Sequence, residues 1–183
     1  MFEMLKMPAM KSGRRQVLGT LGAAGAMAGA LTLSACGFKL REAPTLAFTS
    51  LYVGAADGSL FGNELKRSLT SLGALQVVND AKLKQTAQVL LEVLQDQREK
   101  TVVGVNAAGQ VREFQLRIRV KFRLVTPQGK DLIEETELLQ QRDISFNESA
   151  VLAKEAEEGQ LYRNMQTDIV QQLLRRLAAI KKL

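Results

Sequence analysis

Residues 114–124 read FQLRIRVKFRL, and apolar and polar side chains alternate along this stretch without exception. The even positions hold six apolar residues, and the odd positions hold one glutamine and four cations, Arg117, Arg119, Lys121 and Arg123. Successive side chains of a β-strand point to opposite faces of its sheet. The stretch therefore predicts a strand with one face buried in a core and the other face in contact with water.

The sequence on both sides of this strand predicts three more strands. Residues 47–53 (AFTSLYV) and 87–105 precede it, and residues 131–146 follow it as a more polar strand. Turns are expected at 106–109 and 126–129, where glycine, asparagine and proline gather.

Two helical regions complete the expected fold. Phe61, Leu65, Leu69 and Leu72 recur at helical spacing, and Gly73 is expected to end that helix in the left-handed conformation. A second helical region begins at residue 149, and Gly159 is expected to divide it into two pieces because glycine is a poor helix former. A stripe along it, typical of a helix lying on a sheet, is formed by Met165, Ile169, Leu173 and Leu177. The predicted class is α+β, in the order β-α-β-β-β-α: a mixed four-stranded sheet with two helices packed on one face.

The composition argues against most enzymes. The 183 residues include no histidine and one cysteine, which excludes a Ser-His-Asp triad, a Cys-His pair, a histidine-bound zinc and an internal disulfide. With 46% apolar and 24% charged residues, the chain is expected to fold. We therefore expect a binding protein with no catalytic residues, no metal and no cofactor beyond a covalent lipid.

The N-terminal region predicts export. Residues 16–38 carry no charge, and Lys11, Arg14 and Arg15 precede them, as in a secretory signal. A transmembrane anchor is the alternative, but the apolar run 17–33 is at the short limit for a span. The sequence leaves open which early methionine is the start. Export by the general secretory route is preferred to the twin-arginine route that Arg14 and Arg15 weakly resemble.

Leu33-Ser34-Ala35-Cys36 resembles a bacterial lipobox, and Cys36 is the only cysteine. The resemblance implies an S-diacylglycerol group on Cys36, cleavage before it and an N-acyl chain on the new amino terminus. A free buried cysteine is the alternative. The chain then consists of a lipoprotein signal peptide (1–35), a lipidated tether (36–46) and an α/β domain (47–183). Gly37 replaces the aspartate of an inner-membrane retention signal, so the expected location is the periplasmic side of the outer membrane, held to its inner leaflet by the anchor.

Cleavage would also change the charge. The net charge of +6 falls to +3, because residues 1–35 hold four of the 25 cations and one of the 19 anions. This balance is too weakly basic for a typical nucleic-acid binder, so no nucleic-acid partner is expected.

Four short motifs in this order resemble the LptE family, whose members are lipopolysaccharide-assembly lipoproteins. They are CGFKLR at 36–41, GQ at 109–110, EFQ at 113–115 and LAKE at 152–155, before a terminal helix. The resemblance covers the whole mature chain. It implies a plug subunit inside an LptD-type outer-membrane β-barrel, which helps the barrel assemble and takes part in delivering lipopolysaccharide to the cell surface.

The resemblance also implies contacts with lipopolysaccharide. Family members carry basic residues near the central hairpin tip and in the Leu-Ala-Lys segment, and Lys154 matches the second place. The tip has Ala107 and Ala108 instead, so Arg112 or Lys100 is expected to substitute. For Lys154 the alternative is an ion pair with Glu158 on a solvated helix face.

The cations of residues 114–124 have two explanations. A tight turn would place Lys121 and Arg119 opposite Glu135 and Glu137, as ion pairs across strands. Arg117 and Arg123 lack obvious partners, which makes them candidates for contact with an anionic ligand or with the wet interior of a larger protein.

Two other functions remain as alternatives. A stand-alone periplasmic lipid-carrier lipoprotein would need an apolar cavity, for which a flat sheet covered by two helices has little room. An enzyme could use Asp57, Glu64 and Asp80, but nothing in their spacing brings them together.

Overall fold

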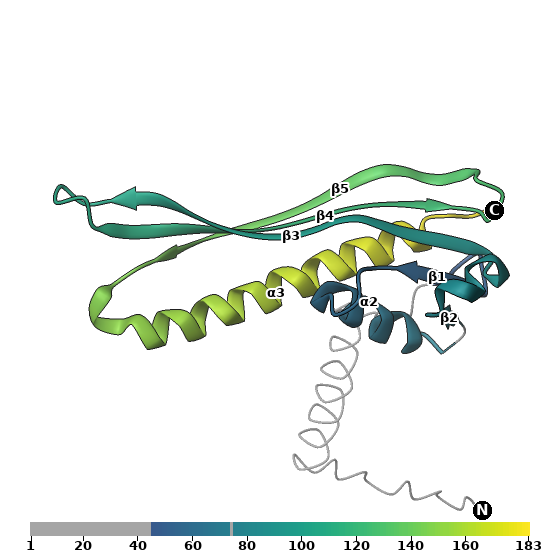
Figure 1. Cartoon of the computed structure of the whole chain (residues 1–183), viewed down its shortest axis with the longest axis horizontal. Helices are drawn as coiled ribbons and strands as arrows, with labels where there is room; N and C mark the ends of the chain where they lie inside the picture. Colours follow the sequence, from purple (N-terminus) through teal and green to yellow (C-terminus); the bar gives the residue numbers. More distant parts are fainter. Residues whose placement is uncertain (1–44, 74) are drawn as a thin grey trace, which may run out of the picture. The chain divides into compact units, whose positions relative to one another are not determined.

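Five strands form one mixed sheet in the order β2-β1-β3-β4-β5 (Figure 1). They are β1 (Ser50–Gly54), β2 (Gln76–Val78), β3 (Val89–Val105), β4 (Val111–Val125) and β5 (Asp131–Ser145). Strand β1 is parallel to β2 and β3, whereas β3, β4 and β5 are antiparallel neighbours. The computed structural model describes residues 45–73 and 75–183. The signal peptide, Cys36 and residues 36–44 of the tether therefore lie outside the described residues.

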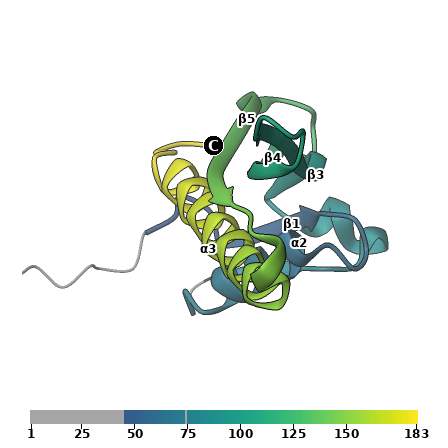
Figure 2. The same ribbon diagram turned by 90° about the vertical axis from the view of Figure 1, so that its left-hand side faces the viewer.

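Two α-helices cover one face of the sheet. Helix α2 (Leu60–Thr70) follows β1, and α3 (Val151–Ala178) runs along β3, β4 and β5 (Figure 1). Seen end-on, α2 and α3 lie to one side of the strands (Figure 2). Two short 3₁₀ helices, η2 (Ala81–Thr86) and η3 (Glu148–Ala150), precede β3 and α3. None of the helices formed by the described residues is long and apolar enough to cross a membrane.

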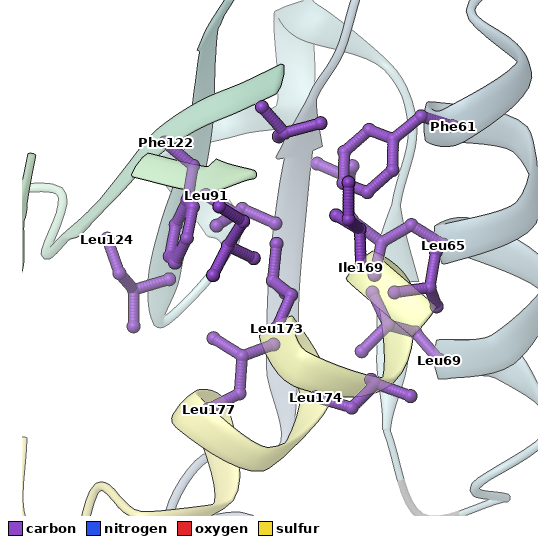
Figure 3. Close-up of a cluster of buried hydrophobic side chains, with 14 of the residues drawn as sticks. Phe61, Leu65, Leu69, Leu91, Phe122, Leu124, Ile169, Leu173, Leu174 and Leu177 are labelled. Atoms are coloured by element: carbon purple, nitrogen blue, oxygen red, sulfur yellow. The ribbon is translucent and has the colours of Figure 1, made fainter. Parts of the chain in front are cut away.

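The core confirms the expected orientation of β4. Leu116, Ile118, Val120, Phe122 and Leu124 are all buried, at 1% exposure or less. They pack with Phe61, Leu65 and Leu69 of α2 and with the Met165, Ile169, Leu173 and Leu177 stripe of α3 in one cluster (Figure 3). Because both helices contribute to this cluster, they lie on the same face of the sheet, as predicted.

The expected four-stranded sheet is corrected to five strands. Strand β2 was missed because its three residues are too short to show an alternation. It forms as the edge partner of β1, and the Gln76 amide donates to the Thr49 carbonyl at 2.8 Å. Gly73 has the expected left-handed conformation, with φ of 73°, but it is not the cap of α2, which ends at Thr70 and is capped by Ser71.

The expected break at Gly159 is wrong, because α3 is one continuous helix of 28 residues. A glycine inside a helix costs about 0.5–1 kcal/mol relative to alanine. The apolar stripe that follows Gly159 is buried on the sheet, and this packing outweighs so small a penalty.

The second face of the sheet is not bare near β1. Tyr52 points away from the main core and packs against a small separate cluster formed by Val78, Ala87, Leu90 and Val125. The connection from β2 to β3 supplies Ala87 and also Lys84, whose ammonium lies 5.9 Å from the centre of the Tyr52 ring. The expectation of an uncovered second face thus holds only for the longer, outer part of the sheet.

Among the described residues, the buried members of the main core run from Phe48 to Leu177, and Leu46 and Ile180 pack against them. These residues fall within one compact unit, Ala43–Leu183. A unit that contains its own core is expected to fold without the residues before it.

We predict that the two faces of β4 respond differently to substitution. Ile118→Asp places a charge in the core and should lower the free energy of unfolding by about 4 kcal/mol or more. Arg117→Gln, one residue away on the other face, should change it by no more than about 1 kcal/mol. Denaturant melts of residues 43–183 would measure both, and equal losses would contradict the assigned orientation of β4.

Candidate functional site

A hollow of about 230 Å³ lies where β3, β4 and the end of β5 meet the first turns of α3. Its apolar wall consists of Phe114, Ile144, Phe146 and Val151. Its polar rim consists of Lys100, Ser145, Lys154, Glu155 and Glu158. The fold thus brings two of the predicted lipopolysaccharide contacts, Lys100 and Lys154, to one hollow, although they lie far apart in the sequence.

Two aromatic rings belong to the apolar wall of this hollow. The rings of Phe114 and Phe146 meet edge to face, with centroids 5.4 Å apart. The Lys100 ammonium lies 4.3 Å from the centre of the Phe114 ring, within the range of a cation–π interaction. The Phe146 amide donates to the Arg112 carbonyl at 2.8 Å and thereby fixes the chain that leaves β5.

Glutamates of α3 already bind both lysines. Lys100 contacts Glu158 at 2.6 Å, and Lys154 contacts Glu157 at 2.9 Å and donates to the Ser145 hydroxyl at 3.0 Å. The alternative of a Lys154–Glu158 pair is therefore wrong in its partner, although Lys154 is indeed paired on its own helix. Glu158 instead binds Lys100 of β3, which lies 58 residues away in the sequence.

Arg112 does not join this hollow. Its side chain is exposed, and its guanidinium donates to the Gln110 side chain at 3.3 Å, near the hairpin tip. The tip itself is the expected turn, closed by the Gly109 amide donating to the Asn106 carbonyl at 2.9 Å. Of the two substitutes suggested for the missing basic residues of the tip, only Lys100 lines the hollow with Lys154.

The outer face of β4 carries the expected ion pairs with β5, but the register differs by two residues from the expected one, because Lys121 lies opposite Glu137 and Arg119 opposite Leu139. Arg119 contacts Glu137 at 3.1 Å, and Lys121 lies 3.8 and 3.9 Å from Glu135 and Glu137. These two cations are therefore neutralised across the strands rather than free for a ligand.

The expectation that Arg123 lacks a partner is wrong. Its guanidinium contacts the Glu92 carboxylate of β3 at 2.7 Å, and Lys84 contacts the same carboxylate at 2.9 Å. Hydrogen bonds from Lys84 and then Arg123 hold the pKa of Glu92 below its ordinary value of 4.5, and Glu92 raises the pKa of Arg123. The β3–β4 register places Glu92 opposite Arg123, and no local sequence motif predicts this pair.

Arg117 is the candidate that the outer face leaves unpaired. Among the described residues it forms no ion pair. Its side chain is half-buried as a whole, and its Nε atom is buried without a hydrogen-bond partner. The Oε1 atom of Gln115, two residues earlier on the same face, also has none, although its amide nitrogen donates to Asp143 at 3.0 Å.

The carboxylates considered for an enzyme have structural roles or stand apart. Glu64 bonds Gln166 and Thr167 and so joins α2 to α3, and Asp80 accepts a hydrogen bond from the Lys82 amide at 2.8 Å. Asp57 is exposed in the loop after β1. Within residues 45–73 and 75–183, no group of three or more acidic or cysteine side chains is placed to hold a metal ion.

A family model for LptE, described as lipopolysaccharide-assembly, matches residues 48–177. The chain belongs to the LptE family. The matched range coincides with the limits of the main core, from Phe48 to Leu177. The LptE match therefore covers the whole sheet and both helices that pack on it, and comparison with curated protein sequences gave no further match.

Solved structures with the same fold agree with the LptE assignment. An uncharacterized lipoprotein B from Nitrosomonas europaea, solved by solution NMR, is 35% identical, with a TM-score of 0.66 over 78% of this chain and 91% of that one. A minor lipoprotein from Acinetobacter baumannii is 25% identical, with a TM-score of 0.58 over 74% and 94% of the two chains. The rare lipoprotein B from Shewanella oneidensis, 20% identical over 72% and 95%, shares the fold at a TM-score of 0.58.

We predict that Glu92 stabilises the fold in a pH-dependent way. Glu92→Gln should lower the free energy of unfolding at neutral pH by about 0.5–1 kcal/mol, a modest amount because the ion pairs are partly exposed. Because folding lowers the pKa of Glu92, its contribution is complete above 4.5 and is lost as the pH falls through the lower, folded-state pKa.

Denaturant melts at a series of pH values would test this prediction. The difference between the unaltered chain and Glu92→Gln should disappear at the acidic end. Glu134→Gln, at an exposed position of β5, is the matched control and should show little difference at any pH. A difference for Glu92→Gln that does not depend on pH would contradict the prediction.

Proposed function

We propose that this LptE-family chain is an outer-membrane lipoprotein that plugs an LptD-type β-barrel, helps it assemble and takes part in delivering lipopolysaccharide to the cell surface. The observation that carries the proposal is the LptE match across residues 48–177. The lipobox at 33–36 and the names of two relatives, both lipoproteins, support the anchor. The protein acts from the periplasmic side, through acyl chains on Cys36.

A binding role without catalysis suits the described residues. Buried side chains of the main core fill the space between the sheet and the helices. A stand-alone lipid carrier would need that space as a ligand cavity, so the packing argues against this alternative. The outer face, with paired charges and glutamine side chains, suits contact with the polar interior of a barrel.

For lipopolysaccharide the hollow at the start of α3 is the best-supported contact. It combines an apolar, aromatic wall with two lysines, and an amphiphile with phosphate groups offers both complementary parts. Arg117 is a second candidate because its guanidinium forms no ion pair among the described residues. Arg123 is a weak one, because it is bound to Glu92.

Co-purification would test the barrel partnership. Tagged full-length protein, isolated from outer membranes in a mild detergent, should bring with it an LptD-type β-barrel in near-equal amount. Residues 1–46 fused to an unrelated soluble domain provide the matched control, because they keep the anchor and lack the LptE-like domain. Recovery of the tagged protein without the barrel would contradict the proposal.

The lipid anchor yields a separate prediction. Cys36→Ser removes the sulfur that accepts the diacylglyceryl group, so the variant should take up no radioactive palmitate in growing cells. Its precursor should also keep the signal peptide or be cut elsewhere. Label on the variant comparable to that on the unaltered protein would show that Cys36 is not the acylated residue. Membrane association is a poorer readout, since a barrel partner can retain the protein.

A further inference from the structure

The charges of the residues that line the hollow cancel. Two lysines, Lys100 and Lys154, and two glutamates, Glu155 and Glu158, line it. A third glutamate, Glu157, binds Lys154 from outside the lining. The hollow therefore does not attract an anion by an excess of positive charge, as a simple phosphate site would.

A phosphate that binds at Lys100 has to displace the carboxylate of Glu158, which already occupies that lysine. The two groups are 2.6 Å apart, with side-chain exposures of 38% and 22%. Lys100 is also held over the Phe114 ring, so it does not swing away freely. A phosphate that takes Lys100 must separate the pair and leave the Glu158 carboxylate, largely shielded from water, without its cation. An unpaired carboxylate in such a place is unfavourable.

A head group with both charges avoids this penalty. Its phosphate replaces Glu158 at Lys100, and an ammonium within the same head group replaces Lys100 at Glu158. The single Lys100–Glu158 pair is then replaced by two ion pairs, Lys100 with the phosphate and Glu158 with the ammonium, so neither side chain is left without a partner. The apolar wall of Phe114, Ile144, Phe146 and Val151 then accepts the attached alkyl part.

We propose that this hollow selects amphiphiles whose head group joins a phosphate to an ammonium, as in phosphoethanolamine, over those whose phosphate is the only charge. Glu158 is the residue that sets this selectivity. The inference rests on the proposed function, since it specifies which phosphate-bearing amphiphile the site takes.

Two matched probes test the proposal. Dodecyl phosphoethanolamine carries the ammonium, and dodecyl hydroxyethyl phosphate has the same phosphodiester and chain with a hydroxyl in its place. Calorimetric titration of residues 43–183, below the micelle concentration and at low ionic strength, measures both. The ammonium probe should bind about tenfold tighter, which corresponds to ~1.4 kcal/mol.

Glu158→Gln should remove this preference, mainly by tightening the binding of the hydroxyl probe. Glu148→Gln is the matched control, because it removes an acidic group just before α3 that does not line the hollow. It should leave the tenfold ratio unchanged. Lys100→Gln should weaken the binding of both probes, which ties the binding to this hollow rather than to general adhesion of alkyl chains.

Equal affinity of the unaltered chain for both probes would overturn the proposal, and so would a preference that persists in Glu158→Gln. The ratio for the unaltered chain needs no variant, so the test holds even if a variant folds poorly. If the barrel co-purifies but the two probes bind equally, only the selectivity is wrong. If neither probe binds, the hollow is not the ligand site, and the barrel partnership still stands. If the barrel is absent while the ammonium preference is found, the proposed barrel partnership fails and the site remains.

Discussion

The burial of one face of β4 is the constraint on which the rest of this structure depends. β4 is the only strand in the described sheet with a long antiparallel neighbour on each side, and its even-numbered side chains face α2 and α3. A shift of its register by one residue would place Arg119 or Lys121 in the core. The positions of β3, β5 and both helices follow from this register, and so does the location of the hollow, which uses Phe114 at the end of β4 that lies beside the hairpin tip.

The same alternation places a row of cations on the outer face of β4, and these cations repel one another unless acidic partners lie beside them. Glu92 from β3 and Glu135 and Glu137 from β5 supply them. Only Arg117 is left without an ion pair among the described residues, although Glu99 stands opposite it in the register. The basic appearance of the strand in the sequence thus becomes a nearly neutral surface in the fold.

Features that depend on neighbouring residues in the sequence could be predicted, whereas features that depend on contacts between distant residues could not. The strand at 114–124, both turns, the apolar stripe of α3 and the left-handed conformation of Gly73 all rest on local patterns, and all are confirmed. The three-residue strand β2 and the continuity of α3 through Gly159 depend on packing against distant elements, so local rules missed them. The partners of Arg123 and Lys100 lie 31 and 58 residues away, and only the register of the sheet and the placement of α3 bring them together. The sequence named Lys100 and Lys154 as separate ligand candidates; it did not predict that they line one hollow, or that glutamates already bind them.

Paired cations also have a consequence for a domain tethered beside a membrane, as proposed here. Each free lysine or arginine near an anionic lipid surface contributes about 1 kcal/mol of attraction. An unpaired row of Arg119, Lys121 and Arg123 would hold the domain against the bilayer that anchors it, in competition with any protein partner. Glutamate partners cancel this attraction to the membrane, yet the cations stay in place. A ligand that binds a cation better than the glutamate does can therefore still displace the glutamate. On such a surface, a ligand is selected by whether it can replace the glutamate bound to each lysine. The total positive charge of the surface does not decide the selection.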